Sequence, residues 1–217
     1  MTTFSPADVV GRAFQIYKDQ AGVLLPAAVA VYAISALASL VFDGGVLFFV
    51  AGAIGTIVGT FYSGMVVRLV DDVRDGVRDA SVGDLFRSVA PVALPLFLLA
   101  VVVGVCVTVG FILLIVPGLF LLTIWAVSAP SVVLEGNGVF EALERSRALV
   151  KGNGWNVFGV IVIVFLLGVG VGLVAGAVGE VGGHGVGVLA QWAANVVFAP
   201  VAALTTSVLF FTLRDGQ

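Results

Sequence analysis

The stretch that decides the fold is residues 92–134, VALPLFLLAVVVGVCVTVGFILLIVPGLFLLTIWAVSAPSVVL, which contains no charged residue. At about 1.5 Å per residue, one helix of this length would extend roughly 65 Å, about twice the roughly 30 Å hydrocarbon core of a bilayer. The stretch must therefore turn back. We expect the turn at Pro117-Gly118, because Pro suits the first turn of a helix and Gly tolerates unusual backbone angles. A turn at Gly110, with Pro117 only kinking the following helix, is the alternative and leaves the helix count unchanged.

Four other apolar stretches flank this one. They are residues 22–42, 46–67, 157–178 and 186–213. Lipid offers no partner to backbone N–H and C=O groups, so apolar segments of this length are expected to be helices. With residues 92–116 and 119–134 as separate spans, the sequence predicts an all-α, polytopic integral membrane protein. It has six transmembrane helices arranged as three hairpins, in one membrane domain covering residues 1–217.

The composition agrees with a membrane protein. Hydrophobic residues make up 60% of the chain and charged residues 11%, whereas soluble domains carry about 45–50% and about 25%. The formal charge of -3, without a basic stripe, argues against nucleic acid as a partner. The single Cys106 cannot form an internal disulfide and reads as a small buried hydrophobe.

The basic residues all fall on one side of this predicted topology. They are Arg12, Lys18, Arg68, Arg74, Arg78, Arg87, Arg145, Arg147, Lys151 and Arg214. The three opposite turns, near Asp43, at Pro117 and at residues 180–185, contain neither Lys nor Arg. Cytoplasmic loops are enriched in positive charge, so we expect a multi-pass protein of the cell (plasma) membrane with cytoplasmic N- and C-termini.

A cleavable signal peptide is rejected, although Ala36-Leu37-Ala38 has the small-x-small form of a cleavage site. The apolar run is too long, and acidic as well as basic residues precede it.

An amphipathic helix is expected before each hairpin, at residues 6–20, 82–90 and 139–151. Each begins with a helix-capping pattern, at Ser5, Ser81 and Gly138, with an acidic residue three positions later. Such helices lie along the membrane interface rather than across it. The chain therefore reads as three diverged copies of one unit. The alternative is that any loop helix beside a membrane shows this pattern.

The third unit carries a recognisable string. It runs Leu114-Ile115-Val116-Pro117-Gly118, then Ala129-Pro130, Glu135, Ala142-Leu143-Glu144-Arg145-Ser146 and Lys151-Gly152, with Trp155. The string resembles the membrane domain associated with glycerophosphoryl diester phosphodiesterases. It is also similar to a wider set of uncharacterised six-helix prokaryotic membrane proteins.

This resemblance implies that the chain corresponds to the membrane domain of such proteins, without the soluble phosphodiesterase domain and its activity. It also points to a family motif on and beside the third cytoplasmic helix. Those residues are Glu135, Ala142, Leu143, Arg145, Ser146, Lys151 and Gly152. The Ser146 hydroxyl lies on the apolar face, where it either bonds back to a carbonyl of its own helix or meets a transmembrane partner.

The predicted spans contain no catalytic constellation. Every Asp, Glu, Lys and Arg lies at or outside a span end, whereas acid-base or ion-coupling chemistry in a membrane needs ionisable groups facing the bundle interior. His184 and Glu180 are too few ligands for a zinc site, and His184 reads as a solvated loop residue. We therefore expect no enzyme activity, no metal and no cofactor.

Neutral polar and small residues mark two further features of the spans. Gln191 and Asn195, continued by Thr206, give the last helix one polar side. That side serves either interhelical hydrogen bonding or a pore or lipid-headgroup site. GxxxG spacing at Gly55 and Gly59, and at Gly168, Gly172 and Gly176, predicts close helix packing, within the chain or between copies.

The leading functional hypothesis is a non-catalytic membrane domain that acts as a scaffold or binds lipid or a partner. The alternative is a channel or carrier for a small neutral or amphipathic solute. Membrane lipids are the expected partners. A protein partner at the cytoplasmic face and a homo-oligomer are both left open.

Overall fold

The computed structural model describes residues 4–41, 45–76 and 81–216, and every regular element in these ranges is a helix. The elements are α1 (Pro6–Asp19), α2 (Ala21–Val41), α3 (Gly45–Arg74), α4 (Val82–Val89), the short 3-10 helix η1 (Ala90–Val92), α5 (Ala93–Leu113), α6 (Ile115–Ile124), α7 (Ser128–Glu135), α8 (Val139–Val150) and α9 (Gly154–Asp215). The turn expected near Asp43 and the basic residue Arg78 lie outside the described residues.

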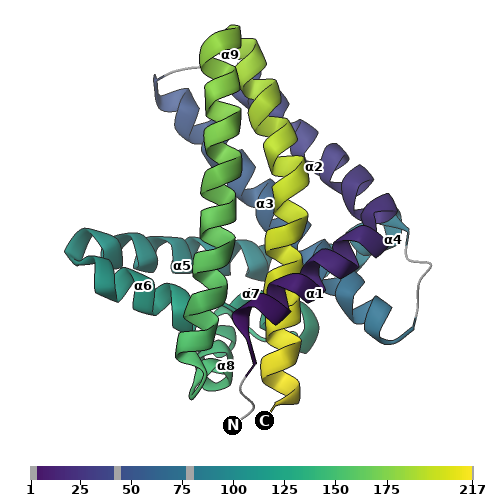
Figure 1. Ribbon diagram of the computed structural model, residues 1–217, viewed down its shortest axis with the longest axis vertical. Helices are drawn as coiled ribbons and strands as arrows, with labels where there is room; N and C mark the ends of the chain where they lie inside the picture. Colours follow the sequence, from purple (N-terminus) through teal and green to yellow (C-terminus); the bar gives the residue numbers. More distant parts are fainter. Residues whose placement is uncertain (1–3, 42–44, 77–80, 217) are drawn as a thin grey trace.

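Helix α9 is a hairpin of two helical arms. Gly183 has φ 78° and ψ -178°, a conformation that is essentially restricted to glycine. Figure 1 shows α9 rising to a tip and returning beside itself, with both chain termini at the opposite end. At the tip a Cβ on Gly179 would lie 2.9 Å from the Cα of Gly187, so the two arms meet backbone to backbone. The turn expected over residues 180–185 is therefore a single-residue break.

The chain reverses between α5 and α6 at Leu114, whose backbone is extended, rather than at the expected Pro117-Gly118. Pro117 lies in the first turn of α6, where a missing N–H costs no helical bond. A Cβ on Gly118 would lie 2.6 Å from the Phe111 ring and one on Gly110 would lie 3.0 Å from Gly118. The Pro-Gly pair thus starts α6 and lets the hairpin close, but it does not make the turn.

The span expected at residues 119–134 is divided into α6 and α7 by a break at residues 125–127. Ser146 of α8 closes this break. Its hydroxyl donates to the carbonyl of Ile124 (2.9 Å) and accepts from the backbone N–H of Val127 (3.2 Å). Ser146 is 0% exposed. The sequence left two alternatives for the Ser146 hydroxyl. In the structure it contacts the membrane segment formed by α6 and α7, and it does not bond to a carbonyl of its own helix.

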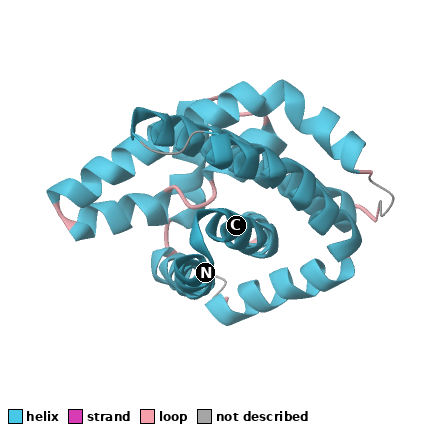
Figure 2. Cartoon of the chain, turned by 90° about the horizontal axis from the view of Figure 1, so that it is seen from above, coloured by secondary structure: helices cyan, strands magenta, loops and turns pink. Residues whose placement is uncertain are grey.

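The core lies around the returning arm of α9. Figure 2 looks along the long axis and shows the C-terminal end of the chain with other helices around it. Leu204 and Phe210 of this arm are fully buried, as is Tyr62 of α3, whose hydroxyl donates to the carbonyl of Leu24 at 3.1 Å.

Helices α1 and α4 bury their apolar faces in the same core, through Val9 and Ala13 of α1 and Leu85 and Val89 of α4. Helices thus occupy the three stretches expected to be interfacial. Their buried apolar residues, however, contact the other helices of the bundle, because these helices offer apolar surface that excludes water.

Five helices in the described ranges are long and apolar enough to cross a membrane, with α9 counted once. The segments are Ala21–Ser39, Gly52–Arg74, Val82–Leu113, Ile115–Glu135 and Gly154–Asp215. The α5–α6 hairpin runs across the direction of the α9 arms (Figure 1), so the three hairpins are not mutually parallel. Its tip is a continuous apolar surface in which Ile112 is 77% and Val116 75% exposed. A patch of this kind on a membrane protein is expected to be covered by lipid.

The break at Gly183 can be tested by adding one methyl group. No atom of the described residues would lie within 4 Å of a Cβ at either Gly183 or Gly185, but only Gly183 has a positive φ. We expect Gly183→Ala to lower the free energy of unfolding by about 1–3 kcal/mol and Gly185→Ala to leave it unchanged or slightly raised. Thermal unfolding of both variants in detergent measures the difference. Equal melting temperatures would contradict the assignment of the break.

The role of Ser146 can be tested against a second buried serine. Ser146→Ala leaves the N–H of Val127 without its acceptor, which is expected to cost about 1–3 kcal/mol. Ser207 is equally buried but donates only to Ala203 of its own helix, so Ser207→Ala is the matched control and should change stability little. Denaturant unfolding in mixed micelles gives both values. A destabilisation by Ser207→Ala as large as that by Ser146→Ala would speak against the proposed closure.

Candidate functional site

A groove lies between α6, the end of α8 and the start of α9, with a volume of about 740 Å³. We call it the α6–α9 groove. Its apolar wall is made by Val116, Leu119, Phe120, Ile124, Val150 and Phe158. Its polar end is made by Thr123, Arg147, Lys151, Gly152, Gly154 and Trp155. Trp155 is 86% exposed at the rim. The groove therefore joins a long apolar surface to two cations.

Arg147 and Lys151 carry charges that the described residues do not neutralise. Both side chains are exposed. Arg74, Arg87, Arg145 and Arg214 each have a carboxylate partner. No ion pair within the described residues involves Arg147 or Lys151. Both therefore present their positive charge to whatever enters the groove.

The N-terminus of α9 adds to this positive end. Asn153 precedes the helix and makes no side-chain capping bond. The first intrahelical bond runs from the N–H of Val157 to the carbonyl of Asn153, so the N–H groups of Gly154 and Trp155 have no partner in the helix. A helix N-terminus attracts anions through these groups and its dipole. Two cations and the first residues of α9 thus line the same groove.

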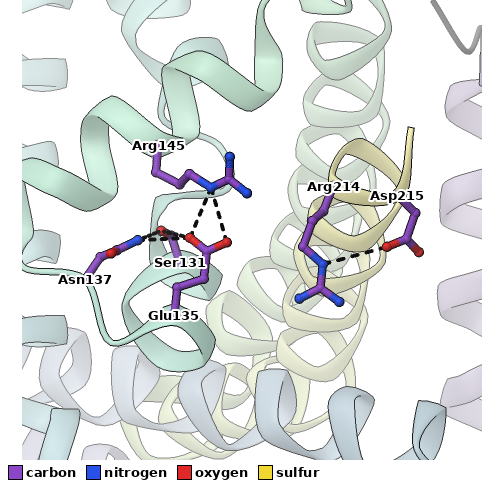
Figure 3. Close-up of polar contacts among 6 residues, drawn as sticks. All are labelled: Ser131, Glu135, Asn137, Arg145, Arg214 and Asp215. Carbon is purple, nitrogen blue, oxygen red and sulfur yellow. Dashed lines mark hydrogen bonds and ion pairs between the residues drawn. The ribbon is translucent and has the colours of Figure 1, made fainter. Parts of the chain in front are cut away.

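Arg145 lies on the same helix but serves a different purpose. Its Nε donates to both oxygens of the Glu135 carboxylate at 3.2 Å (Figure 3). The same carboxylate accepts from Asn137 Nδ2 at 2.9 Å and from Ser131 Oγ at 3.0 Å. Gly136 follows α7 with φ 68°, which allows the sharp turn toward α8. This cluster fixes α8 against the end of α7 and so holds the groove cations in place.

The residues of the expected family motif therefore divide into two groups. Ala142 and Leu143 are buried against α5 and α7, while Glu135, Arg145 and Ser146 tie α8 to α6 and α7. Lys151 and Gly152 line the groove. Sequence reasoning did not single out Arg147 and Phe158 as site residues. The spacing of Arg147 and Lys151, one helical turn apart, was the available signal.

A second cavity lies between α2 and the returning arm of α9, at the tip, and holds about 360 Å³. We call it the tip cavity. The predicted polar residues Gln191 and Asn195 line it, together with Tyr32, Ser35, Ser39, His184 and Trp192. His184 thus stands on a helical arm and not in a loop.

Thr206 is not part of the tip cavity. It donates to Ala202 of its own helix at 3.0 Å and lines a separate hollow with Thr60 and Ser63. The polar side expected from the sequence is thus divided between two places.

The glycines that were predicted to pack helices together also fall into two groups. A Cβ on Gly59 would lie 3.4 Å from the Tyr32 hydroxyl and one on Gly55 would lie 3.9 Å from Ser35 Oγ, so both face α2. Gly168 packs against the Phe198 ring of the other α9 arm. No atom of the described chain would lie within 4 Å of a Cβ on Gly172 or Gly176. In the described ranges, no group of three or more His, Cys, Asp or Glu side chains is placed to hold a metal ion.

The family comparison covers the whole of the α6–α9 groove and the α9 side of the tip cavity, but not the α2 side of that cavity. The model of the Uncharacterised protein family (UPF0259) matches residues 46–202. A UPF0259 membrane protein of Pectobacterium carotovorum subsp. carotovorum (strain PC1) is 32% identical over 104 residues. That match covers 48% of this chain and 41% of the relative, so the chain spans less than half of that protein. No solved structure matches.

These matches do not show the expected link to glycerophosphoryl diester phosphodiesterases. They do show the broader expectation of an uncharacterised prokaryotic membrane protein, because the family model covers most of the chain and the relative is named a membrane protein. The chain belongs to the UPF0259 family of uncharacterised membrane proteins.

Proposed function

We propose that this chain is a non-catalytic membrane domain that binds an acidic phospholipid in the α6–α9 groove. The observation that carries the proposal is the junction of Arg147 and Lys151 with a long apolar wall. An acyl chain fits against Leu119, Phe120 and Phe158, and a phosphate fits between the two cations and the N-terminus of α9.

The charges in the groove favour a lipid with net negative charge over a zwitterionic one. Each Lys or Arg near an anionic membrane surface contributes about 1 kcal/mol of attraction. A zwitterionic headgroup brings a cation of its own, which would lie close to Arg147 and Lys151. The carboxylate of Glu135 is already bound to Arg145, and no ion pair among the described residues joins Arg147 or Lys151 to an acidic side chain.

We further propose that six segments enter the membrane, with both termini cytoplasmic. Gly183 divides α9 into two arms, and each arm extends about 40 Å or more at about 1.5 Å per residue, enough for one crossing. Helix α8 and both chain termini stand at the end of the molecule opposite the α9 tip (Figure 1). Arg145 and Arg147 belong to α8, and Arg214 lies near the C-terminus. The α5–α6 hairpin starts and ends on the cytoplasmic side whatever its tilt.

Neutralising the groove cations should release the lipid. We expect Arg147→Gln/Lys151→Gln to weaken binding of phosphatidylglycerol by more than about ten-fold, because two charges at about 1 kcal/mol each are lost. The measurement is native mass spectrometry of delipidated protein after re-equilibration with mixed phosphatidylglycerol and phosphatidylcholine micelles. The matched control is Lys18→Gln/Arg87→Gln, which removes the same charge from exposed positions outside the groove. Equal lipid retention in the two double variants, or retention that does not depend on lipid charge, would refute the proposal.

The topology can be tested by labelling in intact cells. In a Cys106→Ser background, a membrane-impermeant maleimide should react with Val181→Cys, since Val181 is 92% exposed at the α9 tip. Glu144→Cys on α8 should react only after permeabilisation. Reaction of Glu144→Cys from outside would place α8 on the wrong side of the membrane and overturn the predicted orientation.

A further inference from the structure

We propose that the tip cavity is a binding site for a small uncharged polyol of the size of glycerol. The cavity is separate from the α6–α9 groove and lies at the other end of the molecule, between α2 and the returning arm of α9 (Figure 1). Its volume of about 360 Å³ is within the roughly 300–1,000 Å³ range of ligand pockets.

Two buried polar atoms of this cavity have no hydrogen-bond partner among the described residues. They are Ser35 Oγ and Trp192 Nε1, and both residues line the cavity. A buried donor or acceptor that stays unpaired costs about 1–3 kcal/mol. Leaving two such atoms beside one hollow is expected only if something in the hollow pairs with them.

The chemistry of these atoms specifies what the occupant must offer. The indole N–H of Trp192 can only donate, so the occupant must accept a hydrogen bond there. The Ser35 hydroxyl and the side-chain amides of Gln191 and Asn195 can both donate and accept. Hydroxyl groups satisfy all of these positions, because each hydroxyl is itself a donor and an acceptor.

The cavity lining excludes a strongly charged occupant. Among the described residues that line it there is no Asp, Glu, Lys or Arg, and the lining includes the imidazole of His184. A carboxylate or ammonium buried here would have no opposite charge to offset its desolvation. The small side chain of Ala36 leaves room for the occupant, and Val188 offers apolar contact to the carbon frame of the occupant.

The site extends from the tip into the bundle. Asn195 lies roughly 18 Å along the helix from Gly183 at about 1.5 Å per residue. Tyr32 on α2 faces the same hollow and also contacts the Tyr62 ring at a centroid distance of 5.6 Å. An occupant near Asn195 is thus held between two packed helices.

Trp192 itself can report binding. In a Trp125→Phe/Trp155→Phe background it is the only tryptophan, because the chain has three. Titration of the purified protein with glycerol should change the Trp192 emission saturably. Asn195→Leu, which replaces an amide of the cavity by an apolar group of similar size, should weaken this binding at least ten-fold. Thr206→Val is the matched control on the same arm and should bind as the parent does.

Three results would overturn the proposal. They are no response, a response that stays linear in glycerol concentration, and saturation that is the same in Asn195→Leu. If water is the sole occupant of the cavity, the titration should show no response or a response linear in glycerol concentration. If Asn195→Leu does not fold, Ser35→Ala serves instead. The Ser35 hydroxyl has no hydrogen-bond partner within the described chain, so its loss should weaken glycerol binding and should not lower the melting temperature of the unliganded protein.

Discussion

The structure depends on one constraint, which is that lipid provides no hydrogen bonds to a polypeptide backbone. Every interruption of a helix must therefore be satisfied by the chain itself. At the α9 tip the non-helical conformation is confined to one residue, Gly183. At residues 125–127 the break is longer, and the Ser146 hydroxyl of α8 supplies both the donor and the acceptor. The helices are thus continuous except where a specific residue makes an interruption tolerable.

Much of the fold could be read from the sequence, because hydropathy and capping are local signals. Helices α1, α4 and α8 start where the patterns at Ser5, Ser81 and Gly138 predict, although the side chain of Ser5 makes no capping bond. The exact reversal between α5 and α6 could not be read, because Leu114 has no turn signature. Its extended backbone follows from the close packing of Gly110 against Gly118, a contact between residues on two helices. The break after α6 was missed for a similar reason, since it depends on Ser146, which is distant in the sequence.

The residues of the two hollows could be predicted from the sequence to different extents. Lys151 and Gly152 belong to a motif that pointed to the right region, but the apolar wall of the groove comes from α6 and from Phe158, which no local pattern connects. At the tip, Gln191 and Asn195 were identified by their spacing, whereas Ser35 and Trp192 stand on different helices. Burial of their polar atoms without partners is a property of the assembled bundle. Thr206 was predicted to continue the polar side of Asn195. In the assembled bundle it lines a different hollow.

Three consecutive residues of α8 have three different attachments. Arg145 holds the carboxylate at the end of α7, Ser146 closes the broken segment, and Arg147 faces the α6–α9 groove. One helical turn of α8 therefore carries both a cation of the groove and the hydroxyl that closes the break between α6 and α7. A change in how α8 packs on α7 would alter both places together, because they share one short stretch of backbone.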